Sequence, residues 1–165
     1  MFGAVLTDIF LSFFVAVGFA LLFETPRKAV LLAGLLGGWG HGIRFLLLQN
    51  GADLVSSTMA GTAFVGLAGI YFAHRIHTPP VVFTLPACIT MIPGLYAYRT
   101  ILGCIKIYKA GMATDTGVLL QETAYNFILT SSLLFCLAIG ISIAALAFRK
   151  KNVKEIRKII DLRRK

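Results

Sequence analysis

The chain has 165 residues, of which 58% are hydrophobic and 14% are charged, and its mean hydropathy is +0.83. A soluble domain of this length is far more polar, so the composition predicts a single-domain integral membrane protein. The apolar runs are long and continuous, which favours an all-α bundle over a β-barrel. Of the net charge of +9, residues 149–165 carry +7, which argues against a soluble basic domain that binds nucleic acid.

We expect about five membrane-spanning helices, because each apolar run approaches the ~20 residues that a span needs. The expected spans are residues 2–23, 29–48, 54–73, 78–102 and 124–148, followed by a basic cytoplasmic tail at 149–165. The first run has neither a basic leader nor a cleavage site, so we expect a retained helix rather than a signal peptide. Residues 103–120 are expected to form an interfacial helix and loop. The tail is expected to form either a basic amphipathic helix on the membrane surface or a solvated end.

The second span carries a repeat of small residues. Gly34, Gly38 and Gly42 are four residues apart, so they share one helix face and let a neighbouring helix approach closely. We therefore predict that these three glycines form a helix-packing surface. Comparable stripes occur in the third span, with Thr58, Thr62 and Gly66, and in the fifth span, with Ser132, Cys136, Gly140 and Ala144.

The fourth span is interrupted by Pro86 and by the pair Pro93-Gly94, and it continues into Tyr98 and Arg99. Proline removes a backbone donor, and a broken helix inside a membrane needs surrounding protein or a water-filled cavity. Broken helices hold substrate in many transporters. Two interpretations follow: a kinked helix without a ligand, or a substrate site to which all five of these residues contribute.

Three ionisable residues lie inside apolar runs. His41 and Arg44 are three residues apart and share a helix face, where the guanidinium could hold a carboxylate and the imidazole could take and release a proton. The same pair could instead reach the lipid head groups. Asp8 is interpreted either as a proton or cation site or as the N-terminal cap of the first helix.

Motifs for enzyme catalysis and nucleotide binding are absent from the sequence, so neither an enzyme nor ATP-driven transport is predicted. Cys88, Cys104 and Cys136 have no spacing typical of metal ligands, so we expect neither a metal nor a cofactor. Small buried hydrophobic side chains are the expected role of these cysteines.

Loop charges predict the orientation in the membrane. Five spans place the Arg27-Lys28 turn, the Arg75 turn and the tail on one side, with twelve Lys or Arg against four on the other side. Because basic loops remain in the cytoplasm, we expect a multi-pass protein of the inner cell membrane with its N-terminus outside and its C-terminus in the cytoplasm.

Four segments, taken in chain order, resemble the threonine/serine exporter family. They are Gly18–Phe23 followed by Pro26, Gly40–Arg44 (GHGIR), Val82–Ala87 (VFTLPA) and Met91–Gly94 (MIPG). The resemblance covers residues 1–148 and is to the small subunit, which is equivalent to the C-terminal half of the fused members. The chain departs from the family at Thr90, where many members have proline, and in the basic tail.

The resemblance implies a half-transporter that exports threonine and serine, is driven by the proton-motive force and works with a large subunit in the lipid bilayer. Some two-subunit members resemble dicarboxylate exporters, with succinate as substrate. Under this hypothesis Arg44 or Arg99 binds the carboxylate, and His41 with Asp8 couples proton movement. Two other hypotheses stay open: an accessory subunit that only stabilises its partner, and a homo-oligomeric channel.

Overall fold

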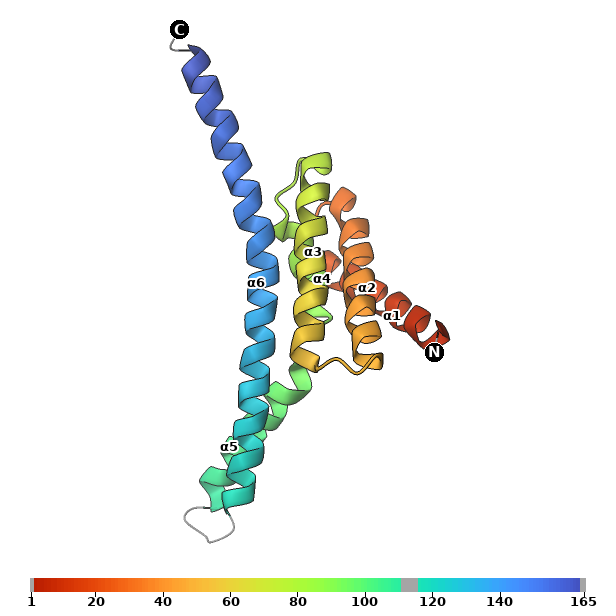
Figure 1. The fold of residues 1–165 in the computed structure, drawn as a ribbon, viewed down its shortest axis with the longest axis vertical. Helices are drawn as coiled ribbons and strands as arrows, with labels where there is room; N and C mark the ends of the chain where they lie inside the picture. The colour runs from red at the N-terminus through yellow and green to blue at the C-terminus, as the bar shows by residue number, and fades with distance from the viewer. Residues whose placement is uncertain (1, 111–115, 164–165) are drawn as a thin grey trace.

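The computed structural model describes the backbone of residues 2–110 and 116–163, and the side chains of residues 3–109, 116–143 and 146. These residues form six helices and no strand, which confirms the predicted all-α class (Figure 1). The helices are α1 (Phe2–Leu22), α2 (Arg27–Gln49), α3 (Leu54–Ile76), α4 (Val81–Ile89), α5 (Gly94–Ala110) and α6 (Thr116–Arg163).

Four of these helices are individually long and apolar enough to cross a membrane: α1, α2, α3 and the first part of α6. A fifth crossing is obtained when α4 and α5 are counted as one span, bent by 64° at the break between them. The expected count of about five spans and the expected break in the fourth are therefore both present. The bend is present with threonine at position 90, at the end of α4.

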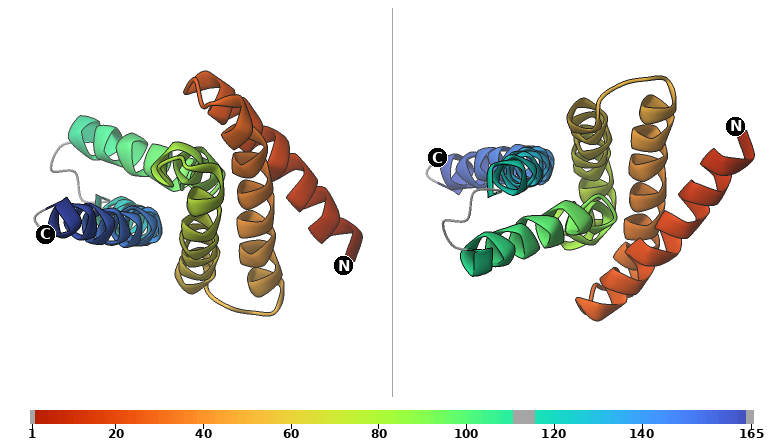
Figure 2. Two further views of the ribbon diagram at one scale, coloured as in Figure 1. Left: turned by 90° about the horizontal axis from the view of Figure 1, so that it is seen from above. Right: turned by 90° about the horizontal axis from the view of Figure 1, so that it is seen from below.

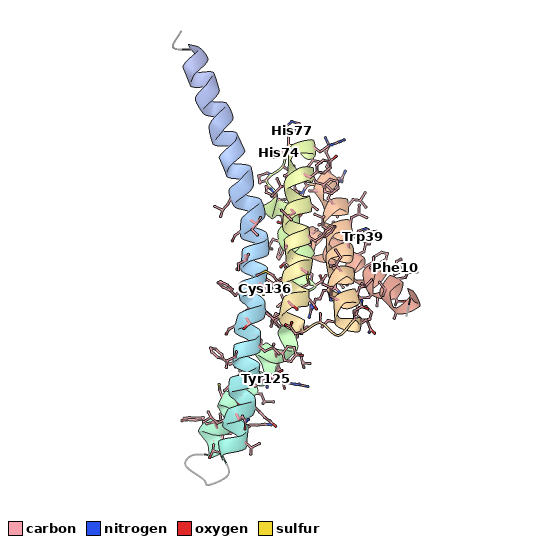
Figure 3. The ribbon with its side chains drawn as sticks, viewed as in Figure 1. Phe10, Trp39, His74, His77, Tyr125 and Cys136 are labelled. Carbon is pink, nitrogen blue, oxygen red and sulfur yellow. The ribbon has the colours of Figure 1, made fainter. Side chains whose placement is uncertain are left out.

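The helices pack side by side across the molecule, from α1 on one side to α6 on the other (Figure 2). Helix α1 crosses α2 obliquely, α2 also contacts α3 and α4, and α6 packs against α3 and α5 (Figures 1 and 2). The buried core lies where α2, α3 and α4 meet and includes Leu36, Val65, Phe83 and Met91. Large apolar side chains such as Phe10 on α1 and Trp39 on α2 lie on the outer surface, as suits contact with lipid (Figure 3).

The glycine stripe of α2 faces α1. A Cβ atom added at Gly38 would lie 2.9 Å from the carbonyl oxygen of Ile9, and one at Gly42 would lie 2.5 Å from the side chain of the same residue. A Cβ at Gly34 would meet Val17 and Phe13. The missing side chains thus let the two helices approach to backbone contact.

A second close approach joins α3 to α6. The hydroxyl of Thr62 donates to the carbonyl oxygen of Cys136 at 3.2 Å, and a Cβ at Gly66 would collide with the carbonyl of Gly140. Both residues of α3 belong to its predicted stripe, and both residues of α6 belong to the stripe of the fifth span. The two stripes therefore face each other.

The structure corrects the expectation for residues 103–120. Residues 103–110 continue α5, and α6 begins at Thr116, so no separate interfacial helix forms within the described part of this segment, while residues 111–115 lie outside it. Helix α6 also continues past residue 148 to Arg163 as one helix of 48 residues. Lys, Arg and Glu are good helix formers, so the loss of hydrophobicity after residue 148 does not end the helix.

The three basic segments lie at one end of the molecule. In Figure 1 the turn before α2 and the end of α3 lie at the upper ends of these helices, the C-terminal part of α6 extends beyond them in the same direction, and the α2–α3 turn lies at the lower ends of α2 and α3. The basic residues concerned include Arg27, Lys28 and Arg75. This arrangement is the one that the orientation predicted from loop charges requires.

Candidate functional site

Pro86 lies buried within α4, and its missing N–H leaves the carbonyl of Val82 without a helical partner. The hydroxyl of Thr25, in the turn between α1 and α2, donates to that carbonyl oxygen at 3.3 Å. The group released by the proline is thus satisfied by protein, as a membrane environment demands. Pro86 consequently shapes the packing of α4 and does not present a free carbonyl at this point.

The break itself occupies residues 90–93. Pro93 cannot donate to the carbonyl of Ile89, which instead accepts from the N–H of Ile92 at 3.0 Å. Helix α5 then begins at Gly94, and its first turn is closed by the bond from the N–H of Ala97 to the carbonyl of Pro93, also at 3.0 Å. The break is therefore a satisfied turn that redirects the chain.

A close contact between His41 and Asp8 joins α1 to α2. His41 Nδ1 lies 2.7 Å from Asp8 Oδ2, and the two side chains are about one fifth exposed, at 21% and 19%. Asp8 lies well inside α1, which begins at Phe2, so the interpretation of Asp8 as a helix cap is wrong. The distance is that of a hydrogen bond between the imidazole and the carboxylate.

Arg44 lies one turn beyond His41 and is half-buried. Its Nε atom is buried and has no hydrogen-bond partner among the described residues, and Asp8 and Tyr96 lie within electrostatic range of its guanidinium. A buried arginine donor without a partner is a costly arrangement in a protein alone, and an anionic ligand would relieve it.

Helix α3 brings Arg44 to the break between α4 and α5. A Cβ atom at Gly61 would lie 3.2 Å from Met91 Sδ and 3.5 Å from Arg44 Cβ, and one at Gly40 would lie 3.0 Å from Met91 Cε. Glycine at positions 40 and 61 therefore lets α2 and α3 pack closely against Met91. We use the name Arg44 cluster for Asp8, His41, Arg44 and Tyr96.

The structure does not bring Tyr98 and Arg99 into the Arg44 cluster. Both side chains are exposed and line a cavity of about 700 Å³ between α5 and α6, whose lining includes neither His41 nor Arg44. Tyr96 lines this cavity as well and is the residue that the two places share. The single site that the sequence suggested is thus divided between two neighbouring places.

Sequence reasoning missed Thr25 and Gly61. Thr25 follows a glutamate in a short polar turn, and Gly61 lies between two members of a small-residue stripe, so both fit ordinary structural roles. Their importance comes from contacts with residues far away in the chain, which a single sequence does not display. Within the described residues, no group of three or more histidine, cysteine or acidic side chains converges to hold a metal ion.

The profile of one protein family matches residues 8–147, and its description reads Threonine/Serine exporter, ThrE. The matched region extends from Asp8 to the membrane-spanning part of α6 and so contains the Arg44 cluster, the break and the α5–α6 cavity. No solved structure matches the chain.

Proposed function

Because this chain belongs to the threonine/serine exporter family, we propose that it is the small subunit of a secondary exporter for small metabolites that carry a carboxylate. Its apolar helices and its family support a multi-pass membrane transporter. The proposed substrates are threonine and serine, or a dicarboxylate such as succinate. The proposed driving force is the proton gradient, and the proposed partner is a separate, larger membrane subunit.

The observation that carries this proposal is the unpartnered Nε of Arg44 beside a broken span. A guanidinium pairs with a carboxylate through two parallel hydrogen bonds, and its affinity rises where water is excluded. Ionisable residues at membrane depth usually mark substrate or ion pathways. Arg44 is therefore assigned to the carboxylate of the substrate.

The neighbouring pair of His41 and Asp8 is assigned to proton coupling. His41 and Asp8 are in direct contact, and Asp8 also lies within electrostatic range of Arg44. A substrate carboxylate on Arg44 changes the charge that Asp8 and His41 experience, so binding and protonation become linked. This linkage is what proton-driven export requires.

The broken span is assigned to the shape of the site. Pro86 and the Pro93-Gly94 pair set the course of α4 and α5, and the bend leads the chain from Met91 beside the Arg44 cluster to Tyr98 and Arg99 on the α5–α6 side. Discontinuous helices in transporters place substrate groups at such breaks. The remaining walls of the substrate path are proposed to come from the large subunit or from a second copy of this chain.

The test is threonine export from proteoliposomes that contain the full chain with its partner subunit. Arg44→Gln is expected to lower the initial rate at least about tenfold, because a charge-assisted hydrogen bond is lost, and Arg44→Lys is expected to be intermediate. Arg75→Gln is the matched control, since Arg75 is exposed at the opposite end of α3. An Arg44→Gln complex with the rate of the control would overturn the assignment.

Proton coupling is tested separately in the same vesicles. His41→Gln and Asp8→Asn are expected to keep threonine exchange while losing accumulation driven by a pH gradient. If both variants accumulate threonine normally and Gly38→Leu abolishes assembly with the partner, the chain is an accessory subunit. Export by the chain alone would indicate a homo-oligomeric channel.

A further inference from the structure

The cavity between α5 and α6 carries charges of both signs on facing helices. Arg99 and Lys106 lie on α5, two turns apart on one helix face, and Glu122 lies on α6. The volume of about 700 Å³ exceeds that of a single small amino acid, so a ligand can enter together with water. Among the side chains that the structure describes, none of these three charges has an ion-pair partner.

The two helices are held in a fixed relation at the centre of this cavity. Gly103 of α5 is buried, and a Cβ atom there would collide with the side chain of Thr123 on α6. Arg99 lies one turn before Gly103 and Lys106 lies about one turn after it, so both cations flank the contact. Glu122 adjoins Thr123 and so lies close to the same level of the hairpin.

The remaining polar lining is uncharged and can hydrogen-bond a hydroxyl group. Asn126 lies one turn after Glu122, and Gln121, Tyr96 and Tyr125 also line the cavity. Figure 3 shows Tyr125 on the half of α6 that runs beside α5. Paired cations, one acid and several neutral donors and acceptors match a molecule with a carboxylate, an ammonium group and a short polar side chain.

We propose that the α5–α6 cavity is a second amino-acid site, in which Arg99 and Lys106 bind the carboxylate and Glu122 binds the ammonium group. The proposal rests on the proposed export of small carboxylates and adds a residue that discriminates among them. A dicarboxylate would bring a second negative charge toward Glu122, and like charges in such a site repel. Tyr96 connects this site to the Arg44 cluster, so the two sites are successive stations on one path.

The test measures how much threonine binds to the full chain, with its partner, in nanodiscs of phosphatidylcholine. The wild-type complex is expected to bind two threonine molecules per copy of this chain, and both Arg44→Gln and Glu122→Gln are expected to bind one. Glu122→Gln is expected to weaken the affected site about tenfold or more for threonine and to leave succinate binding unchanged or stronger. Arg99→Gln is expected to weaken that site for both ligands.

Two further variants keep the result interpretable. Lys109→Gln removes a positive charge from α5 outside the cavity lining and is expected to match the wild type. Asn126→Leu narrows the cavity without changing its charge and is expected to remove the second site. One threonine per chain in the wild type, unaffected by Glu122→Gln but lost in Arg44→Gln, overturns the second site and leaves the proposed function standing.

A lipid head group is the competing occupant, since phosphatidylethanolamine carries a phosphate and a primary ammonium group that can donate to Glu122, whereas the quaternary ammonium of phosphatidylcholine has no N–H donor. If added phosphatidylethanolamine abolishes the effect of Glu122→Gln on threonine binding, the cavity is a lipid site and the proposal is wrong. The same holds if Glu122→Gln changes the binding of this lipid but not that of threonine. Threonine binding that is lost in neither Arg44→Gln nor Glu122→Gln contradicts both the second site and the proposed function.

Discussion

The hydroxyl of Thr25 compensates for the proline at position 86, and this compensation can be measured. Thr25→Val keeps the shape of the side chain and removes the donor, so the Val82 carbonyl loses its partner and the free energy of unfolding is expected to fall by about 1 kcal/mol. Thr25→Ser retains the hydroxyl and serves as the control. In a Pro86→Ala background the helix supplies its own donor, so the cost of Thr25→Val is expected to shrink. An equal loss of unfolding free energy in both backgrounds would show that the Thr25 hydrogen bond does not compensate for Pro86.

Asp53 is the N-terminal cap of α3, and it makes the stability of that helix depend on pH. Its carboxylate accepts hydrogen bonds from Ser56, through both the hydroxyl and the backbone N–H, and from the N–H of Val55. These bonds, the Ser56 hydroxyl first among them, lower the pKa of the Asp53 carboxyl below its ordinary value.

A lowered pKa in the folded state fixes the sign of this dependence. The stabilisation is fully present above the pKa of the unfolded chain and is lost as the pH falls through the lower pKa of the folded state. In thermal unfolding scans from neutral to acidic pH, Asp53→Asn is expected to show a shallower acid decline than the wild type. Curves that stay parallel over this range would contradict the prediction.

At the scale of the helices, the contact between α1 and α2 depends on glycine at position 38 but not at position 18. Gly38→Ala places a methyl group 2.9 Å from the carbonyl oxygen of Ile9, so α1 must shift and the free energy of unfolding is expected to drop by about 1–3 kcal/mol. Gly18→Ala is the matched control in α1, because no atom lies within 4 Å of its added Cβ. The control is expected to be neutral or slightly stabilising. Similar losses in the two variants would exclude close packing as the cause.

The bend between α4 and α5 has two candidate causes that one variant separates. Pro93→Ala restores the donor that a continuous helix needs, so the bend is expected to open. Spin labels at the exposed positions 85 and 105 report this change, since a straight helix of that length spans about 30 Å and a bent one spans less. An unchanged distance would show that the packing of Met91 against Gly40 and Gly61 holds the bend without the proline.

For the molecule as a whole, the common end of the basic segments leads to a topology prediction. A fluorescent protein fused after residue 165 is expected to fluoresce, and alkaline phosphatase at the same place is expected to be inactive, because the loop charges predict a cytoplasmic C-terminus. Fusions in the α2–α3 turn, at the opposite end, are expected to give the reverse result. Identical behaviour of both fusion positions would contradict the five crossings.

Sequence alone predicts the local features of this molecule but not the contacts between distant residues. The class, the spans, the glycine stripe of α2 and the break at Pro93 follow from composition and spacing, because each is a local property of the chain. The separation of Arg99 from Arg44 does not follow, since the bend and rotation of α5 depend on how several helices pack together. The contact of Asp8 with His41 was equally beyond reach, because it joins positions 33 residues apart.

Helix α6 has a mechanical consequence that its role as a membrane span does not suggest. Its 48 residues measure about 72 Å, more than twice the hydrocarbon thickness of about 30 Å, and it is held at its middle by the contact of Thr62 with Cys136. A tilt of α6 about its contact with α3 would displace both of its ends. Because that contact lies near the middle of the helix, a tilt of about 5° would move each end by about 3 Å in opposite directions, so a displacement beside the α5–α6 cavity would be matched by one of similar size at the basic end.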